Sequence, residues 1–483
     1  MVAKESFRQV GACSWELAKS HDERMQAPAR IYAGQVLFER AFGDRSVEQL
    51  VNVAMLPGLV KYAMAMPDMH QGYGFPIGGV AAFSYDQGII SPGGVGYDIN
   101  CGVRMLTSRM DYEDIAPHID ALATALYRHC PSGVGGSGAV SLSWGELNAV
   151  LDRGSGWALS HGYASAEDVA RTESEGCLPQ AQSAAVPDRA KARGRGQLGS
   201  LGSGNHFLEI DVVDEVYDTG TAECFGLRVG QVVVQIHCGS RGLGHEVCTQ
   251  SLRQLQDAPR RYGIAIPDRE LVAAPIGSPE GQAYLASMAA AANYAFANRQ
   301  VLAHFVRLAF EEILAGKISD WHLDQLYDVT HNIAKVEDHT VDGVPMRLVV
   351  HRKGATRAFP AGRPELPDVY RTTGQPVLVP GSMGTYSYVL AAEPASLELT
   401  LGSSCHGAGR RMSRRAATRA VRGESVRAQL KAQGVAVRAK SMRRLAEEAP
   451  LAYKDVSLVV ESVVGAGIAR KVARVRPVAV IKG

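Results

Sequence analysis

With 483 residues and a formal net charge of only +2, the chain has no overall attraction to a polyanion, so any such preference must come from local patches. The N-terminus is interrupted by charges from Lys4 to Lys19, and no stretch has the length needed to span a bilayer, so we expect a cytoplasmic protein without membrane contact. Eight cysteines without framework spacing predict free thiols and exclude a disulfide scaffold.

Helical spacing of apolar residues marks several segments. Ser46–Gln49 has the form of a capping box and predicts a short helix that ends before Pro57. Residues 111–129 predict a second helix, and the alanine-rich stretch 283–314 shows the clearest helical pattern. A short helix is also predicted over 323–329.

Residues 65–76 are rich in glycine and proline and predict an ordered loop. The loop places Asp68 and His70 two residues apart, so their side chains share a face if the backbone is extended. A solvated loop that carries one Asp and one His is the alternative.

Residues 91–104 contain four glycines beside a carboxylate and a thiol. The glycines let the backbone turn tightly and aim Asp98 and Cys101 at one point. Because a thiolate can bridge two ions and a carboxylate adds a harder oxygen, this pair predicts the core of a two-metal site. A buried cysteine in a glycine turn is the alternative for this stretch taken alone.

Two predicted strands present histidines beside glycine turns. Residues 202–210 predict a strand entered through a turn that carries His206. The β-branched run 231–236 predicts a strand that ends on His237 and opens a loop with Arg241, which suits joint presentation of an imidazole and a phosphate anchor. One such histidine is usually structural, whereas several favour a shared site.

The last third supplies a candidate nucleophile. His406 lies among residues too small to crowd it, and a neutral imidazole can displace pyrophosphate from a nucleoside triphosphate to give a phosphoramidate. Arg410 would offset the charge that develops on the phosphate. Strands are predicted over 346–350, 456–464 and 478–481, and a basic glycine loop over 351–357 is suited to phosphate.

Two basic segments are candidates for contact with phosphates. Residues 181–200 predict a mobile basic loop over a phosphate-bearing ligand. Residues 410–445 carry many lysines and arginines against the single acid Glu424 and predict a basic helical segment that contacts a nucleic-acid backbone. A solvated surface is the alternative for both.

Seven ordered motifs resemble those of the RtcB family of RNA-splicing ligases, from about residue 30 to the final Lys482-Gly483. The length resembles that of the longer archaeal and eukaryotic-type members. Cys238 stands where serine is expected in many relatives and adds a thiol near the predicted metals. The motifs are Asp68–Gly72, Ser91–Gly102, Gly204–Phe207, His237–Gly242, Asp328–Asn332, Pro380–Thr385 and His406–Arg410.

The resemblance implies a ligase that uses GTP and two Mn²⁺ ions to join an RNA 3′-phosphate or 2′,3′-cyclic phosphate to a 5′-hydroxyl. His406 would take GMP from GTP and pass it to the RNA 3′-phosphate, in tRNA splicing or RNA repair. A cyclic phosphate would first be opened by metal-activated water. The resemblance leaves open whether the small protein archease is needed as a partner, and the sequence does not reveal the oligomeric state.

The same resemblance implies the site residues. Glu209 would accept hydrogen bonds from the guanine edge that distinguishes G from A. By ligand softness alone the metal donors favour zinc or iron before manganese, whereas the resemblance favours manganese. Metal ligands would be Asp98, Cys101 (bridging), His206, His237 and His331; guanylate contacts would be Asn205, Phe207, Glu209, Ser382, Ser387, Tyr453 and Lys482; phosphate or RNA contacts would be Arg241 and Arg410.

Two functions of other classes fit parts of the pattern. A dinuclear metal-dependent phosphodiesterase would use the Asp, Cys and His cluster without an adduct on His406. A non-catalytic RNA-binding protein would use residues 410–445 and would have no need of clustered metal ligands. Only the ligase would retain label from GTP on the protein.

Short strands, irregular glycine loops and a few long helices without a regular βαβ order predict an α+β fold. By resemblance, mixed and antiparallel sheets would surround a central metal cleft with flanking helices. The same pattern favours one catalytic domain over residues 1–483, and no internal repeat is visible.

Overall fold

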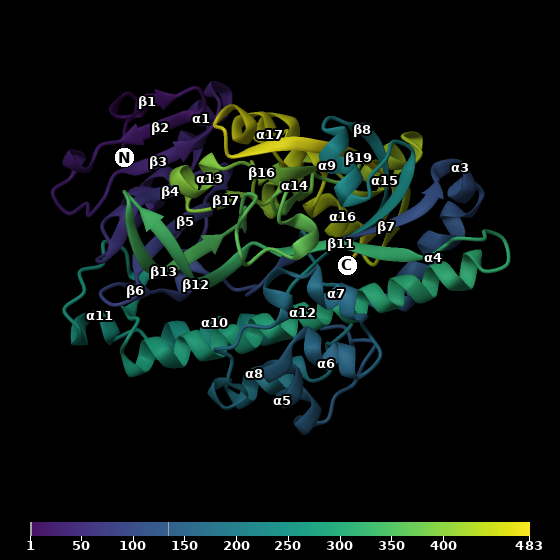
Figure 1. Cartoon of the computed structure of the whole chain (residues 1–483), viewed down its shortest axis with the longest axis horizontal. Coiled ribbons are helices and arrows are strands. Elements are labelled where there is room, and N and C mark those ends of the chain that lie inside the picture. Colours follow the sequence, from purple (N-terminus) through teal and green to yellow (C-terminus); the bar gives the residue numbers. More distant parts are fainter. Residues whose placement is uncertain (1, 134) are drawn as a thin grey trace.

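The computed structural model describes residues 2–133 and 135–483 and contains two large mixed sheets with helices around them (Figure 1). The predicted α+β class is confirmed. The first sheet has seven strands in the spatial order β1 (Arg8–Gly11), β2 (Ser14–Leu17), β3 (Ala29–Tyr32), β4 (Leu59–His70), β5 (Ile77–Ser84), β13 (Val344–Lys353) and β12 (Asn332–Val341). All neighbours in it are antiparallel except β3 and β4.

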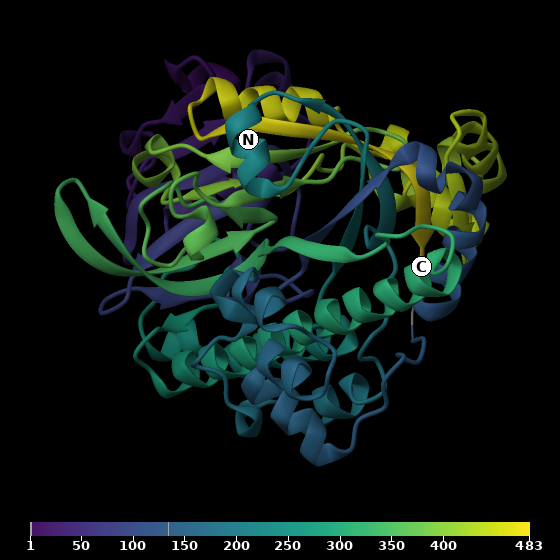
Figure 2. The ribbon, with the colours of Figure 1, turned by 45° about the vertical axis from the view of Figure 1, so that its right-hand side comes forward.

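The second sheet has eight strands and lies beside the first (Figure 2). Its order is β11 (Leu323–Thr330), β7 (Gly102–Asp111), β9 (Gln231–Cys238), β8 (Phe207–Val216), β19 (Ala469–Lys482), β16 (Ser387–Ala392) and β15 (Pro376–Val379), and β18 (Ala436–Ala439) runs parallel to β19. Two short pairs complete the strands: β6 (Ile89–Ile90) with β10 (Ala274–Pro275), and β14 (Ala355–Arg357) with β17 (Ser403–Cys405).

Helices cover the sheets and form a separate layer below α12 in Figure 1, where α5, α6 and α8 lie. Within the described residues, no helix is both long enough and apolar enough to cross a bilayer. The helices are α1 (Gln35–Arg40), α2 (Ser46–Ala54), α3 (Tyr112–Ile115), α4 (Ile119–His129), α5 (Trp144–Arg153), α6 (Ser155–Ser160), α7 (Ala166–Ala170), α8 (Asp188–Gly194), α9 (Thr219–Phe225), α10 (Arg241–Gln254), α11 (Ala258–Arg261), α12 (Pro279–Leu314), α13 (Ala395–Thr400), α14 (Arg414–Ala420), α15 (Gly423–Ala432), α16 (Met442–Glu447) and α17 (Val456–Gly465).

The long helix α12 connects the cores under the two sheets. It has 36 residues, so it spans about 54 Å. Its first half belongs to the same buried apolar cluster as β4 and β5, and its second half, from Leu302 to Leu314, belongs to the cluster that contains α4 and strands of the second sheet. The helix predicted over 283–314 is confirmed, and its burial makes α12 a common support for both sheets.

Two predicted elements are wrong in type. Residues 323–329 form strand β11 rather than a helix, because Leu323–Thr330 pairs along β7 in an antiparallel register. Residues 456–464 form helix α17 rather than a strand. The Asp455 side chain accepts the N–H of Ser457 and caps this helix, and the buried valines 456, 459, 460 and 463 follow helical spacing.

Two predicted loops contain regular structure. The first six residues of segment 65–76 are the end of β4, so Asp68 and His70 lie on a strand. In segment 181–200, residues 188–194 form α8 rather than a loop, and its Arg189 and Arg193 pair with Glu246 of α10. The first of these changes matters for the site, because a strand fixes where Asp68 points.

Two helix predictions need smaller corrections. Ser46 begins α2 but forms no capping box, because its hydroxyl donates to the carbonyl of Ala41. The helix expected over 111–129 is two helices, α3 and α4, separated by a 3₁₀ turn that contains Pro117. The strands expected over 231–236, 346–350 and 478–481 are confirmed and longer than predicted.

Candidate metal centre and adjoining cavity

The register of the second sheet brings distant residues to one edge. Thr330 of β11 lies opposite Gly102 of β7, and Gly102 lies opposite Cys238 of β9. His237 lies opposite Phe207 of β8, which in turn lies opposite Lys482 of β19. At this edge β7 and β8 begin and β9 and β11 end. Residues that are far apart in the chain therefore meet there, namely Cys101, His206, His237 and His331.

Five predicted metal ligands converge at this edge. The Cys101 Sγ lies 3.3 Å from the Nε2 atoms of both His206 and His237. The His237 Nε2 lies 3.2 Å from the Nε2 of His331, and the His206 Nε2 lies 2.7 Å from the Oδ2 of Asp98. These donors form two groups that share Cys101, each with ligand atoms within 4.8 Å of one another. The arrangement fits two ions with Cys101 between them.

The protonation states of two of the histidines suit metal binding, whereas at His206 the nearby Cys101, Cys238 and Asp98 outweigh burial and raise the pKa well above the usual range. Burial and neighbouring charges hold the pKa of His237 and of His331 well below the usual range, which keeps both imidazoles neutral. Burial raises the pKa of the Cys101 thiol to about 12 when no ion is bound. A metal would therefore displace a proton from Cys101 on binding, since the thiolate is the ligand.

His406 lies directly beside this cluster, at the end of β17. Its ring centroid is 4.9 Å from that of the candidate ligand His331. The Oδ2 of the buried Asp68 accepts hydrogen bonds from the His406 Nδ1 at 2.5 Å, from the His406 backbone N–H at 2.9 Å and from the Gly407 N–H at 3.3 Å. Because a carboxylate only accepts hydrogen bonds, Nδ1 carries a proton, and Nε2 holds the lone pair whenever the imidazole is neutral.

The sequence did not identify Asp68 as a partner of His406. Its neighbour His70 gave the only signal, an acid and a histidine two residues apart. In the structure His70 also lines the cavity, and its Nδ1 lies 3.0 Å from the carbonyl oxygen of Asp68. Burial lowers the pKa of His70 to about 4, so this ring is neutral at physiological pH.

A cavity of about 440 Å³ adjoins the cluster and His406. It is large enough for a nucleotide-sized ligand to be partly enclosed. Ser387 does not line it, because its hydroxyl accepts the N–H of Gly381. The predicted site residues that do line it are Asp98, Cys101, Asn205, His206, Phe207, Glu209, His237, Arg241, His331, Ser382, His406, Arg410, Tyr453 and Lys482.

Part of the cavity lining is polar and buried. Lys482 donates to the carbonyl of Gly204 at 3.1 Å and lies over the ring of Phe207. Glu209 is also buried there, and burial with the nearby Asp211 raises its pKa well above the usual range. Without a ligand Glu209 therefore favours its neutral carboxyl form beside the buried Lys482, and a ligand that donates hydrogen bonds to Glu209 would favour the carboxylate.

Arg410 is held by a residue that the sequence did not single out. Its guanidinium donates to the Glu448 carboxylate at 3.0 Å, to the Tyr453 hydroxyl at 3.3 Å and to the Glu447 carbonyl at 2.9 Å. Glu448 also pairs with Arg414. Only the tertiary fold reveals this clamp, because Glu448 lies 38 residues from Arg410.

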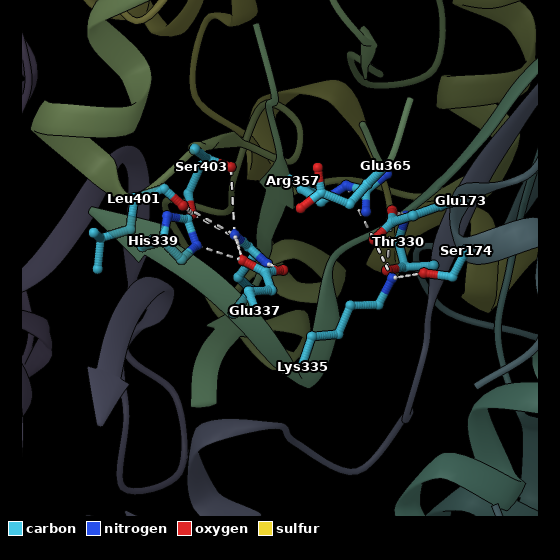
Figure 3. A network of polar contacts seen from close by, with 12 residues as sticks. Glu173, Ser174, Thr330, Lys335, Glu337, His339, Arg357, Glu365, Leu401 and Ser403 are labelled. Carbon is cyan, nitrogen blue, oxygen red and sulfur yellow. Dashed lines mark hydrogen bonds and ion pairs between the residues drawn. The ribbon is translucent and has the colours of Figure 1, made fainter. Parts of the chain in front are cut away.

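The basic glycine loop predicted over 351–357 is wrong, because most of these residues form strands. Residues 351–353 belong to β13, and their side chains are buried. Arg352 makes two hydrogen bonds to Glu337 at 2.6 and 2.9 Å, in a network that includes His339 (Figure 3). Arg357 belongs to β14 rather than to a phosphate loop, and its Nε lies 3.8 Å from Glu173.

Glu173 in the same network supports the chain just before His331. It accepts the backbone N–H of Thr330 at 3.0 Å and pairs with Lys335 at 2.5 Å (Figure 3). Lys335 in turn donates to Ser174. The network thus fixes both the strand that ends before His331 and the strand that follows it.

Lys353 allows a test of how burial lowers the pKa of a lysine and so changes stability with pH. Its Nζ donates to the carbonyls of Tyr73 and Phe75, and burial lowers its pKa to about 8. Between pH 8 and the unfolded pKa of about 10.4, only the unfolded state holds this proton, so stability rises with pH. We expect Lys353→Met to reduce that slope of the unfolding free energy by up to about 1.4 kcal/mol per pH unit. Denaturant unfolding at pH 8, 9 and 10 measures the slope.

The exposed Lys317 provides the control for this prediction. Lys317→Met should leave the slope of the unfolding free energy unchanged. Equal slopes for the wild type and Lys353→Met between pH 8 and 10 would show that burial does not depress the pKa of Lys353.

The fold and the site together define an α+β protein with a buried candidate two-metal centre beside an oriented histidine. A family model described as tRNA-splicing ligase RtcB matches residues 49–483, and the chain belongs to this family, as its motifs predicted. It is 54% identical to the tRNA-splicing ligase RtcB of Thermococcus kodakarensis and 51% identical to that of Archaeoglobus fulgidus, over 99% of each chain. It is also 51% identical to the RNA-splicing ligase RtcB of Mycobacterium bovis, over 90% of this chain and 100% of that protein.

Proposed function

We propose that this protein is an RNA ligase of tRNA splicing or RNA repair. It joins an RNA 3′-phosphate or 2′,3′-cyclic phosphate to a 5′-hydroxyl, uses GTP and two Mn²⁺ ions, and forms a GMP adduct on His406. The observation that carries the proposal is the position of His406, held by Asp68 with its ring 4.9 Å from His331 in the metal-ligand cluster.

The first step forms a bond between the His406 Nε2 and the α-phosphorus of GTP, and pyrophosphate leaves. Asp68 stabilises the positive charge that develops on the imidazole. The RNA 3′-phosphate oxygen then attacks the same phosphorus and releases His406. The 5′-hydroxyl attacks the activated 3′-phosphate, and GMP leaves.

The residues that would hold the ions are Asp98, Cys101, His206, His237 and His331, in two groups that share Cys101. The ions would polarise phosphoryl oxygens and activate water for opening a cyclic phosphate. Manganese is the proposed metal on family grounds, although a cysteine and three histidines are also good ligands for zinc.

The basic segment from Arg410 to Arg444 lies next to the cavity, and Arg410, Arg414 and Arg444 line it. It forms α14, α15, β18 and α16, so it is not helical throughout. Exposed arginines such as Arg415 and Arg419 of α14 extend the positive surface beyond the cavity. This surface suits the RNA backbone, whose phosphates attract arginine.

Glu209 tests the proposed guanine contact. Guanine presents two donors, N1–H and the N2 amino group, to a carboxylate, whereas adenine presents an acceptor at N1. We expect Glu209→Gln to reduce the preference for GTP over ATP in adduct formation by about 10- to 100-fold. Label transfer from each nucleotide measures the preference. Glu215→Gln, farther along β8, is the control, and an undiminished preference in Glu209→Gln would rule out this contact.

The function is tested with a defined RNA that ends in a 3′-phosphate and a second RNA with a 5′-hydroxyl. Joining is assayed with GTP or ATP, with Mn²⁺, Zn²⁺ or Fe²⁺, and with or without added archease. The proposal requires GTP-dependent joining and label from α-labelled GTP on the protein. Cleavage without label would instead indicate a dinuclear phosphodiesterase, and RNA binding without bound metal would indicate a non-catalytic protein.

A further inference from the structure

The side of the metal-ligand cluster that faces α12 contains a group of fully buried polar side chains. Asn298 and Arg299 of α12, together with Asp328 and Arg104, have no exposed surface. Arg104 and Arg299 both pair with Asp328 at 2.8 Å. A buried ion group is weak evidence for stability, because desolvation offsets the attraction between its charges. Its place against the cluster therefore calls for another explanation.

Arg299 contacts the backbone beside two candidate ligands and a side chain close to a third. Its Nη1 donates to the carbonyl of Asn100 at 2.7 Å and to the carbonyl of Cys238 at 2.9 Å. Asn100 immediately precedes Cys101, and Cys238 immediately follows His237. Its Nε and Nη2 donate to the two carboxylate oxygens of Asp328, both at 2.8 Å, three residues before His331.

The planar guanidinium group of Arg299 can make all of these contacts at once. Five N–H groups in fixed directions can serve two carbonyls on one side and a carboxylate on the other. A lysine has a single ammonium group at the end of a flexible stem, so it cannot hold all three partners at once. Arg299 thus ties β7, β9 and β11 to one another at their ligand-bearing ends.

The backbone at Asn100 needs such support. Its φ of 58° lies in the left-handed region, which is unfavourable for a residue other than glycine. Its N–H donates to the carbonyl of Asn332 at 2.7 Å, and its side chain donates to the carbonyl of Ala292 in α12 at 2.8 Å. With the bond from Arg299, these contacts hold a strained residue directly before the shared ligand Cys101.

Asn298 acts on the neighbouring loop. Its side-chain oxygen accepts the N–H groups of Gly199 and Ser200, and its amide nitrogen donates to the carbonyls of Ser200 and Gly239. The loop that approaches His206 is therefore tied to the chain after His237 by the residue next to Arg299. Two adjacent side chains of one helix thus touch the surroundings of four candidate ligands.

From these contacts we infer that Arg299 is a positioning residue, which sets the spacing of Cys101, His237 and His331 before any ion binds. The inference rests on the proposed metal centre and adds to it the element that keeps the centre in shape. Outer contacts of this kind commonly change metal affinity by 10- to 100-fold when they are removed.

The test compares Arg299→Lys and Arg299→Met with the wild type. We expect both variants to bind Mn²⁺ and Co²⁺ about 10- to 100-fold more weakly in calorimetric titrations. With Co²⁺, the thiolate charge-transfer band of Cys101 should be weaker or shifted, which reports the geometry without any ligase assay. Excess metal should restore part of the GMP adduct on His406.

Arg307 is the matched control. It lies eight residues further along α12, makes two hydrogen bonds to Asp168 at 2.7 Å and donates to the carbonyl of Leu323, so its local chemistry resembles that of Arg299. It contacts none of the candidate ligands or their neighbours in the described structure. Arg307→Lys should lower thermal stability but keep the metal affinity and the Co²⁺ band of the wild type.

The outcomes separate the inference from the proposed function. Wild-type protein that binds no divalent metal would overturn the metal centre itself. Wild-type protein that binds metal, together with an Arg299→Lys variant of equal affinity and an unchanged band, would overturn the positioning role. An Arg299→Lys chain that cannot be recovered folded would also contradict it, because a positioning residue leaves the fold intact.

Discussion

Replacement of His406 by alanine is expected to abolish formation of the GMP adduct and with it RNA joining. The imidazole Nε2 is the nucleophile of the proposed first step, and alanine offers no atom that can form a bond to phosphorus. The candidate metal ligands are untouched, so bound metal should stay at the wild-type level. Incubation with α-labelled GTP followed by denaturing electrophoresis measures the adduct, and elemental analysis measures the metal.

His322→Ala provides the control for this prediction, because His322 is exposed and belongs to neither the cluster nor the cavity. It should form the adduct at the wild-type rate. Labelled GMP on the His406→Ala protein would disprove the role of His406. Loss of both label and metal from that variant would instead assign His406 to the metal site.

Replacement of Asp68 by asparagine is expected to slow adduct formation by about 10²- to 10⁴-fold, the range found when the carboxylate that orients a catalytic histidine is neutralised. Asp68 accepts the proton-bearing Nδ1 of His406 and two backbone N–H groups. An amide keeps the size of the side chain but removes the negative charge, so the imidazolium that forms in the first step loses its stabilisation. Single-turnover labelling gives the rate.

Asp86→Asn is a suitable comparison, because Asp86 is an exposed carboxylate in the turn after β5. It should leave the labelling rate unchanged. Thermal unfolding shows whether Asp68→Asn remains folded. A folded Asp68→Asn protein that labels as fast as the wild type would mean that His406 needs no charged partner.

Local sequence patterns predicted a helix or strand correctly where the pattern lies within that one element. The β-branched run before His237 predicted β9, and alanine-rich helical spacing predicted most of α12. The same approach failed for α17, where valine's preference for strands outweighed the helical spacing of its buried side chains. It also failed for β11, whose strand form depends on pairing with β7 more than two hundred residues earlier.

The candidate ligands could be named from glycine turns and family motifs, but their partners could not. The contact between Asp68 and His406 joins residues 338 positions apart, and that between Arg299 and Asn100 joins residues 199 apart. No local pattern encodes such pairs, because they arise only when both sheets are assembled. Ser387, which the resemblance placed near the guanylate, accepts the N–H of Gly381, and its contact with a nucleotide stays a prediction.

The alignment of five strands along one edge makes the centre sensitive to errors of pairing. Side chains of a strand alternate between faces, so a slip of β9 by a single position would turn His237 to the opposite face of the sheet. The neighbouring strands would then present an incomplete set of candidate metal ligands. Tight metal capture would therefore report that the whole sheet has reached its native alignment, which makes metal uptake a sensitive measure of correct refolding.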